Sequence, residues 1–144
     1  MVLREATLDD AASIAELVSQ LGYVTRPDEM LERLRAIGAD DSYYTLVAVM
    51  DSIVVGVAGI GIGHFYERNG LYGRLLVFVV HESQRGDGVG RALLREAESW
   101  ALGKGASVMV VNSGHERIGA HAFYKAAGYS PTGLRFIKPL SGAV

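Results

Sequence analysis

The chain of 144 residues contains no cysteine, only three prolines and one tryptophan, and no marked excess of either charge. The absence of cysteine excludes disulfides, thiolate metal sites and cysteine nucleophiles, and it is compatible with a reducing cytoplasm, where we expect the protein to act. We also expect no bound metal. A formal net charge of -2 gives no indication of nucleic-acid binding, for which a basic patch is usual. At this length we predict a single domain that spans residues 1–144.

One apolar segment, residues 44–63, is about as long as a membrane-spanning helix. Asp51 and Ser52 interrupt it in the middle, and it contains four glycines. This pattern is typical of two buried strands joined by a tight turn. The charged residues near the N-terminus do not resemble a signal peptide. We therefore expect no association with a membrane.

The most informative stretch is residues 75–94, LLVFVVHESQRGDGVGRALL. The apolar run 75–80 predicts a strand buried on both faces, and a helical pattern follows the glycines. A glycine-rich turn at a helix N-terminus favours anion binding, because N–H groups without partners and the helix dipole meet there and glycine lets the backbone approach the ligand. Arg85 and Arg91 flank the turn. The stretch predicts a phosphate-bearing ligand.

The glycines at 86, 88 and 90 form G-x-G-x-G, which is not the dinucleotide-binding fingerprint G-x-G-x-x-G. The sequence also lacks G-x-x-x-x-G-K-[ST], so it does not predict a nucleotide P-loop. A turn that merely joins a strand to a helix remains the alternative interpretation.

The remaining patterns predict a mixed sheet with helices on both faces, an α/β fold. Thr7 and Asp10 resemble a capping box that opens the first helix, and Gly22 ends it. The predicted helices cover residues 11–21, 27–38, 88–102 and 117–127. The predicted strands cover residues 2–6, 43–50, 53–62, 72–80 and 107–111, and a final strand pair lies within 129–138.

Two motifs resemble those of the GNAT family of N-acetyltransferases. Arg85, Gly88 and Gly90 match its acyl-CoA-binding motif [QR]-x-x-G-x-[GA], and residues 120–129 are similar to its A-x-x-F-Y-x-x-x-G-[FY] segment. The order of elements is also that of the family, so the resemblance covers nearly the whole chain. Within the family, Ser113, Arg117 and His121 resemble the branch of small-amine acetyltransferases such as the aminoalkylphosphonate type.

The resemblance implies a splayed sheet and acetyl-CoA as cosubstrate. The backbone of Val79 and Val80 would pair with the pantetheine arm, and the loop 85–91 would hold the pyrophosphate. Tyr124 matches the tyrosine that acts as general acid toward the departing thiolate. The cofactor-binding residues implied are Val79, Val80, Arg85, Gly86, Asp87, Gly88, Val89, Gly90, Arg91, Asn112, Ser113 and Arg117.

Several of these residues also have a purely structural interpretation. Tyr124 could be a core aromatic of an amphipathic helix, Ser113 a helix cap and Arg117 a solvated first-turn residue. The general base is open, because Val77 stands where many family members carry a carboxylate. The side-chain candidates that remain are His64, Tyr66, Glu67, Glu82 and His121, while a deprotonation relayed by water or capture of the neutral amine needs no dedicated residue.

We therefore predict an acetyl-CoA-dependent N-acetyltransferase that acts on a primary amine of a small molecule by direct attack in a ternary complex. The alternatives are an acyl-CoA-binding sensor without turnover, and an acetyltransferase of protein lysines or N-termini. The expected partner is a small-molecule amine, and a homodimer is compatible with the family. The acceptor, the oligomeric state and the use of other acyl groups stay open.

Overall fold

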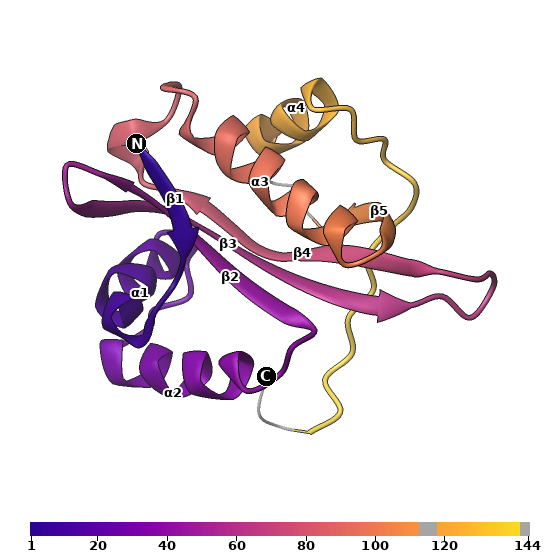
Figure 1. Cartoon of the computed structure of the whole chain (residues 1–144), viewed down its shortest axis with the longest axis horizontal. Helices are drawn as coiled ribbons and strands as arrows, with labels where there is room; N and C mark the ends of the chain where they lie inside the picture. Colours follow the sequence, from indigo (N-terminus) through magenta and orange to yellow (C-terminus); the bar gives the residue numbers. More distant parts are fainter. Residues whose placement is uncertain (113–117, 142–144) are drawn as a thin grey trace. The chain divides into compact units, whose positions relative to one another are not determined.

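The computed structural model describes residues 1–112 and 118–141 and divides into two compact units, Met1–Val111 and Asn112–Val144. The first unit holds a five-stranded sheet in the order β1-β2-β3-β4-β5 (Figure 1). Strands β1 to β4 are antiparallel neighbours, and β5 runs parallel to β4. The predicted mixed sheet is confirmed. The strands are β1 Val2–Glu5, β2 Tyr43–Met50, β3 Ile53–His64, β4 Leu71–Val80 and β5 Ala106–Val111.

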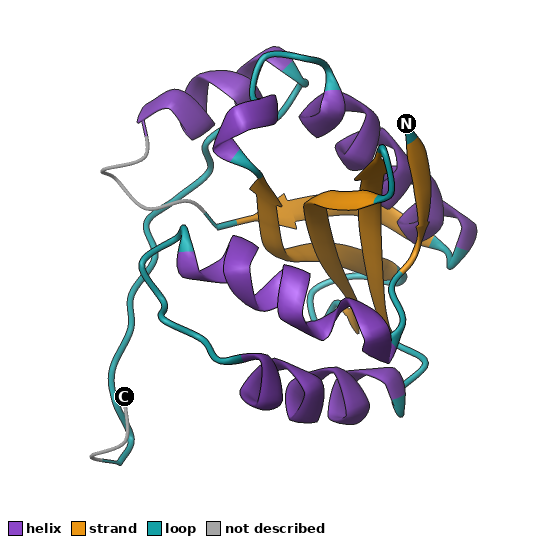
Figure 2. Cartoon of the chain, turned by 90° about the vertical axis from the view of Figure 1, so that its left-hand side faces the viewer, coloured by secondary structure: helices purple, strands orange, loops and turns teal. Residues whose placement is uncertain are grey.

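Three helices of the first unit cover both faces of this sheet, as predicted (Figures 1 and 2). Helices α1 (Ala11–Ser19) and α2 (Pro27–Gly38) pack on one face, in a cluster that includes Ile14, Val57 and Val79. Helix α3 (Val89–Gly103) covers the other face with a stripe of apolar residues at helical spacing. Across the described residues, no helix is long and apolar enough to cross a membrane.

Local sequence signals explain where the first elements begin and end. The Asp10 carboxylate accepts the Thr7 backbone N–H at 2.7 Å and two bonds from Arg4 at 2.8 and 2.9 Å, which fixes the entry into α1 through the short 3-10 helix η1 (Leu8–Asp10). Between β2 and β3, Asp51 and Ser52 adopt φ angles of 51° and 65°. Positive φ at both central residues is the signature of a type I′ hairpin turn. Both sequence predictions are confirmed.

Strand β4 differs from its prediction as a strand buried on both faces. Leu76 is 52% exposed, although it lies within the apolar run. The register explains this, because Gly59 pairs with Val77 and Ile60 pairs with Leu75, which leaves Leu76 as an extra residue in a β-bulge. Apolar composition alone did not reveal the bulge.

The second unit contains helix α4 (Ile118–Ala126), which Gly128 follows with a φ of 95°. The strand pair predicted within residues 129–138 is wrong: the described residues after α4 form no strand, and residues 130–141 are exposed. Pro131 has no N–H to donate to a ladder and Gly133 adds backbone freedom, so the apolar residues Leu134 and Phe136 did not suffice to form one.

Candidate functional site

The sheet of the first unit opens between β4 and β5. These strands pair from Leu71 with Ala106 to Leu75 with Val111, and no further among the described residues. On its other edge β4 stays paired with β3 up to Val80, which lies opposite Gly56. Within the part of the chain that the structure describes, the last five residues of β4 therefore present one backbone edge without a strand partner.

The hydrogen bonds beside this edge show which backbone groups face it. The His81 N–H donates to the Val55 carbonyl at 2.7 Å, so His81 faces β3. Because alternate residues of a strand direct their backbone groups to opposite edges, Val79 also faces β3 and Val80 faces the open edge. The Val80 carbonyl accepts a bond of 3.2 Å from Arg85 Nε. The Val80 N–H thus lies on the open edge.

The backbone of the loop that follows is arranged in a way that can bind an anion. After the 3-10 helix η2 (Glu82–Gln84), Gly86 and Gly88 adopt φ angles of 90° and 82°, and Gly88 is the N-cap of α3. The first hydrogen bond of α3 joins the Ala92 N–H to the Gly88 carbonyl at 3.1 Å. The N–H groups of residues 89–91 precede that bond and have no intrahelical acceptor. They suit a phosphate oxygen.

The side chains of the loop differ in what they contribute. Arg85 bonds back to strand β4 and ties the loop to it, and Arg91 is exposed in the first turn of α3. Val89 as a whole residue is 1% exposed, so its side chain is not available to a ligand. Asp87 is exposed and adds a negative charge to the loop.

The other predicted site residues lie in or beside the second unit. Asn112 directly follows β5 and is exposed, whereas Ser113 and Arg117 fall outside the described residues. Tyr124 is half-buried on α4, where its ring meets those of Phe123 and Tyr129 edge-on at centroid distances of 5.5 and 5.8 Å. The roles of these residues stay predictions.

The candidates for a general base are mostly solvent-exposed. His64, Glu67 and Glu82 are exposed, and Tyr66 is fully exposed at the tip of the β3–β4 hairpin. A polar contact that sequence reasoning missed lies nearer to the open edge, where His81 Nε2 is 3.8 Å from Glu16 Oε1 of α1. No motif signals this contact, because the two residues come from separate elements.

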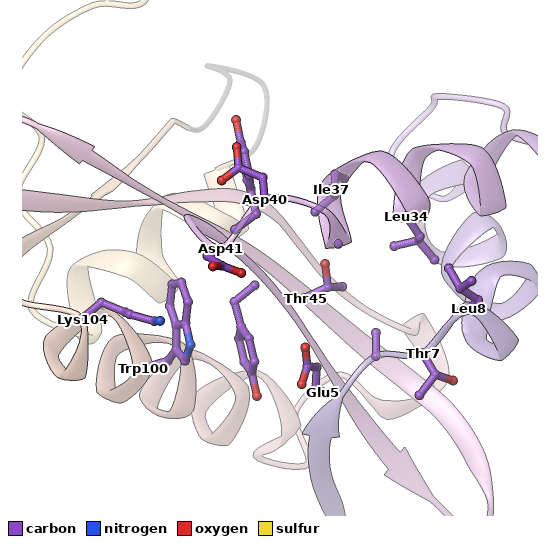
Figure 3. A pocket seen from close by; sticks show the side chains of 14 residues that line it. Glu5, Thr7, Leu8, Leu34, Ile37, Asp40, Asp41, Thr45, Trp100 and Lys104 are labelled. Atoms are coloured by element: carbon purple, nitrogen blue, oxygen red, sulfur yellow. The ribbon is translucent and has the colours of Figure 1, made fainter.

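A cavity of about 360 Å³ lies elsewhere in the first unit, at the edge of β2 (Figure 3). Trp100 and Lys104 of α3 line it together with Leu34 and Ile37 of α2, and carboxylates come from Glu5, Asp40 and Asp41. Tyr44 stacks on Trp100 at 4.8 Å, and burial raises the pKa of Tyr44. Since α3 rises 1.5 Å per residue, its two ends are about 20 Å apart. The cavity is therefore separate from the loop 85–91.

Comparisons with known proteins agree with this arrangement. A model of the acetyltransferase (GNAT) family matches residues 11–129. The chain is 33% identical over 134 residues to an aminoglycoside N(6')-acetyltransferase type 1 of Stenotrophomonas maltophilia, covering 90% of this chain and 86% of that protein. It is 28% identical over 143 residues to an aminoalkylphosphonate N-acetyltransferase of Salmonella typhimurium, covering 96% and 90%.

Solved structures show the same fold. A GNAT family acetyltransferase of Staphylococcus aureus superposes with a TM-score of 0.82 at 27% identity, covering 96% of this chain and 98% of that one. An aminoglycoside N-acetyltransferase in complex with CoA gives a TM-score of 0.81 at 20% identity, covering 97% and 99%. The second likeness concerns the fold alone.

Proposed function

Because the chain belongs to the GNAT family of acetyltransferases, whose members use acetyl-CoA, we propose that it transfers the acetyl group to a primary amine of a small molecule. The aminoglycoside and aminoalkylphosphonate acetyltransferases among its relatives, named for small amines, support this choice of acceptor. A protein lysine or N-terminus is the acceptor that we consider less well supported.

The proposal rests on one observation: the open edge of β4 lies directly before the N-terminus of α3, and glycines with positive φ form the loop between them. The pantetheine arm would lie along the last residues of β4, where the Val80 N–H can donate to one of its carbonyls. The pyrophosphate would lie against the N–H groups of residues 89–91. The positive φ of Gly88 turns the chain so that α3 starts there.

The chemistry follows from these positions and from the absence of cysteine. Without a cysteine nucleophile, we propose that the amine itself attacks the thioester carbonyl in a ternary complex. A C–N bond forms, the C–S bond breaks, and the amine loses a proton to water. The departing thiolate, with a pKa of about 8.5 for a free thiol, takes up a proton. We assign its donation to the phenol of Tyr124.

We further infer that residues 1–144 form one catalytic domain. The family model spans residues 11–129 and so crosses the boundary between the two units at Val111.

A thiol-release assay tests the proposal. The purified protein is incubated with acetyl-CoA and a panel of small amines, and free CoA thiol is measured with a disulfide reagent. The chain has no cysteine, so it contributes no background. We expect thiol release that depends on the amine and mass-spectrometric detection of the N-acetylated product. Acetylation confined to a lysine-containing peptide, or binding of acetyl-CoA without release for any amine, would contradict the proposal.

A further inference from the structure

The bulge at Leu76 reverses which face of the sheet the side chains of β4 point to. A Cβ built on Gly73 would lie 3.0 Å from the Ala101 Cβ of α3, so position 73 faces α3. Val79 lies in the cluster with α1 and α2, on the opposite face. In a regular strand these two positions would share a face, because they are six positions apart, an even number. The extra residue Leu76 accounts for the change.

Before the bulge, the even-numbered positions of β4 therefore point to the face that carries α1 and α2. Arg74 is one of them and is exposed. It lies directly opposite Gly61 of β3, so no side chain on that strand fills the space beside it. A Cβ on Gly61 would lie 3.2 Å from Leu76 Cδ1 and 3.3 Å from Tyr43 Cε1. We call the surface formed by Tyr43, Tyr72, Arg74 and Leu76 the Arg74 surface.

The Arg74 surface combines two tyrosines and a leucine with one cation. Leu76 is 52% exposed and Tyr43 41% exposed. The guanidinium carbon of Arg74 lies 5.7 Å from the centroid of the Tyr72 ring, and within the described part of the chain Arg74 pairs with no carboxylate. It is also the only charged residue of β4. Its charge is therefore not compensated by a neighbouring side chain of the strand.

Arg74 lies close to the start of the open edge of β4. That edge begins at Leu76, two residues further along the same strand. At about 3.3 Å per residue, Arg74 lies roughly 7 Å before the first residue of the open edge, a distance that its side chain and a two- or three-carbon acceptor can span together. An amine that attacks a thioester held at the start of this edge could thus place a second group against the guanidinium.

We propose that Arg74 binds an oxyanion group of the acceptor, a carboxylate or a phosphonate a few bonds from the amine. This rests on the acetyl transfer proposed above. The planar guanidinium can donate two parallel hydrogen bonds to such a group, and Leu76 offers an apolar contact for the carbons between the two ends. A second ammonium group of an acceptor would instead meet a like charge there. Arg74 therefore selects amino acid-like acceptors over polycationic ones.

The test uses four primary amines that differ in their second group: 2-aminoethylphosphonate, β-alanine, ethanolamine and 1,3-diaminopropane. Each is assayed for kcat/KM with the wild type, Arg74→Gln, Arg74→Glu and the matched control Arg95→Gln, which removes an exposed arginine of α3. We expect the wild type to prefer the two acids. Arg74→Gln should lower kcat/KM for both by at least about tenfold and change ethanolamine by less than about twofold. Arg74→Glu should make the diamine the preferred acceptor.

Direct binding separates failure of this inference from failure of acetyl transfer. The dissociation constants of 2-aminoethylphosphonate and ethanolamine are measured by calorimetry on the protein saturated with CoA, for the wild type and Arg74→Gln. The inference is supported if the wild type binds the phosphonate more tightly than ethanolamine and Arg74→Gln abolishes this difference. This holds even if no amine is acetylated, a result that would contradict only the proposed function. Equal binding of the two amines, or an equal loss for every acceptor in Arg74→Gln, would overturn it. A preference for the phosphonate over β-alanine would identify the oxyanion.

Discussion

At the scale of single residues, the loop before α3 shows what a motif can and cannot predict. The sequence predicted a glycine-rich turn that lets the backbone approach a phosphate, and the structure adds that Gly86 and Gly88 adopt positive φ angles, which glycine does without strain. It did not predict that Arg85 donates a hydrogen bond back to the Val80 carbonyl. A motif fixes the type of a long side chain but not the direction in which it extends.

Tyr124 is the residue on which the proposed general-acid step depends. Replacing it with phenylalanine keeps the ring, which packs edge-on against Tyr129, and removes only the hydroxyl. We expect Tyr124→Phe to lower kcat by about a hundredfold, the range typical of general-acid catalysis, and to leave the affinity for acetyl-CoA nearly unchanged. Steady-state kinetics and calorimetric titration check both quantities.

Tyr129→Phe is the matched control, because it removes a hydroxyl from the neighbouring ring. We expect it to retain wild-type kcat. If both variants lost activity equally, or if Tyr124→Phe mainly weakened the binding of acetyl-CoA, the assignment of Tyr124 as general acid would be wrong.

Asp10 gives a prediction about stability and pH. Its hydrogen bonds with Arg4 lower its pKa below the ordinary value of 3.8, despite the opposing effect of burial. A carboxylate whose pKa is lower in the folded state than in the unfolded state stabilises the fold at pH values above its unfolded pKa. This contribution is lost as the pH falls through its folded pKa. We expect Asp10→Asn to lower the free energy of unfolding by about 1–2 kcal/mol at pH 7.

This difference between the wild type and Asp10→Asn should shrink below about pH 4 and vanish once Asp10 is protonated in both states. Urea titrations between pH 2.5 and 7 measure it. Asp28→Asn is the control, because the exposed Asp28 pairs with Arg26 at the surface and should contribute little. A difference that stayed constant with pH would contradict the role of the Asp10 charge.

At the scale of elements, sequence periodicity predicted helices better than it predicted the detail of strands. Apolar residues at helical spacing located α1, α2 and α3, since one buried stripe is enough to define a helix. The apolar run at 75–80 predicts a strand buried on both faces, and this prediction is wrong because Leu76 is 52% exposed in a β-bulge. One extra residue changes the face of the sheet to which every following side chain points. The amino-acid composition of the strand does not indicate such a bulge.

The contact between β4 and α3 depends on glycine at position 73. An added methyl group would lie 3.0 Å from the Ala101 Cβ and 3.1 Å from Met109 Sδ. We expect Gly73→Ala to lower the free energy of unfolding by about 1–3 kcal/mol, the usual cost of overpacking a core. Chemical denaturation followed by Trp100 fluorescence measures this change.

Gly38→Ala provides the comparison for Gly73→Ala. Gly38 ends α2, its φ is not positive, and a Cβ there would meet nothing within 4 Å. Alanine should be neutral or slightly stabilising at this position. Should Gly73→Ala prove as stable as Gly38→Ala, the close approach of α3 to β4 would not be a constraint on the fold.

At the scale of the whole molecule, the sequence predicted the mixed sheet, its helices on both faces and the family. These follow from long apolar patterns and from two motifs at a fixed separation. The strand pair within residues 129–138 was predicted wrongly, because apolar residues there are interrupted by Pro131 and Gly133. The Arg74 surface could not be predicted either, since strand pairing places Tyr43 of β2 and Arg74 of β4 on either side of Gly61 of β3.

The most direct test of the central claim is a calorimetric titration of acetyl-CoA into the wild type, Gly88→Glu and Gly70→Glu. Both glycines have a positive φ and open space around the Cβ position, so the two variants add the same charge and similar strain. Gly70 precedes β4, about 30 Å along that strand from the end where the loop 85–91 begins. We predict micromolar binding for the wild type and Gly70→Glu, and a loss of at least about tenfold for Gly88→Glu. Equal binding by all three proteins, or none by the wild type, would contradict the assignment of this loop as the acetyl-CoA site.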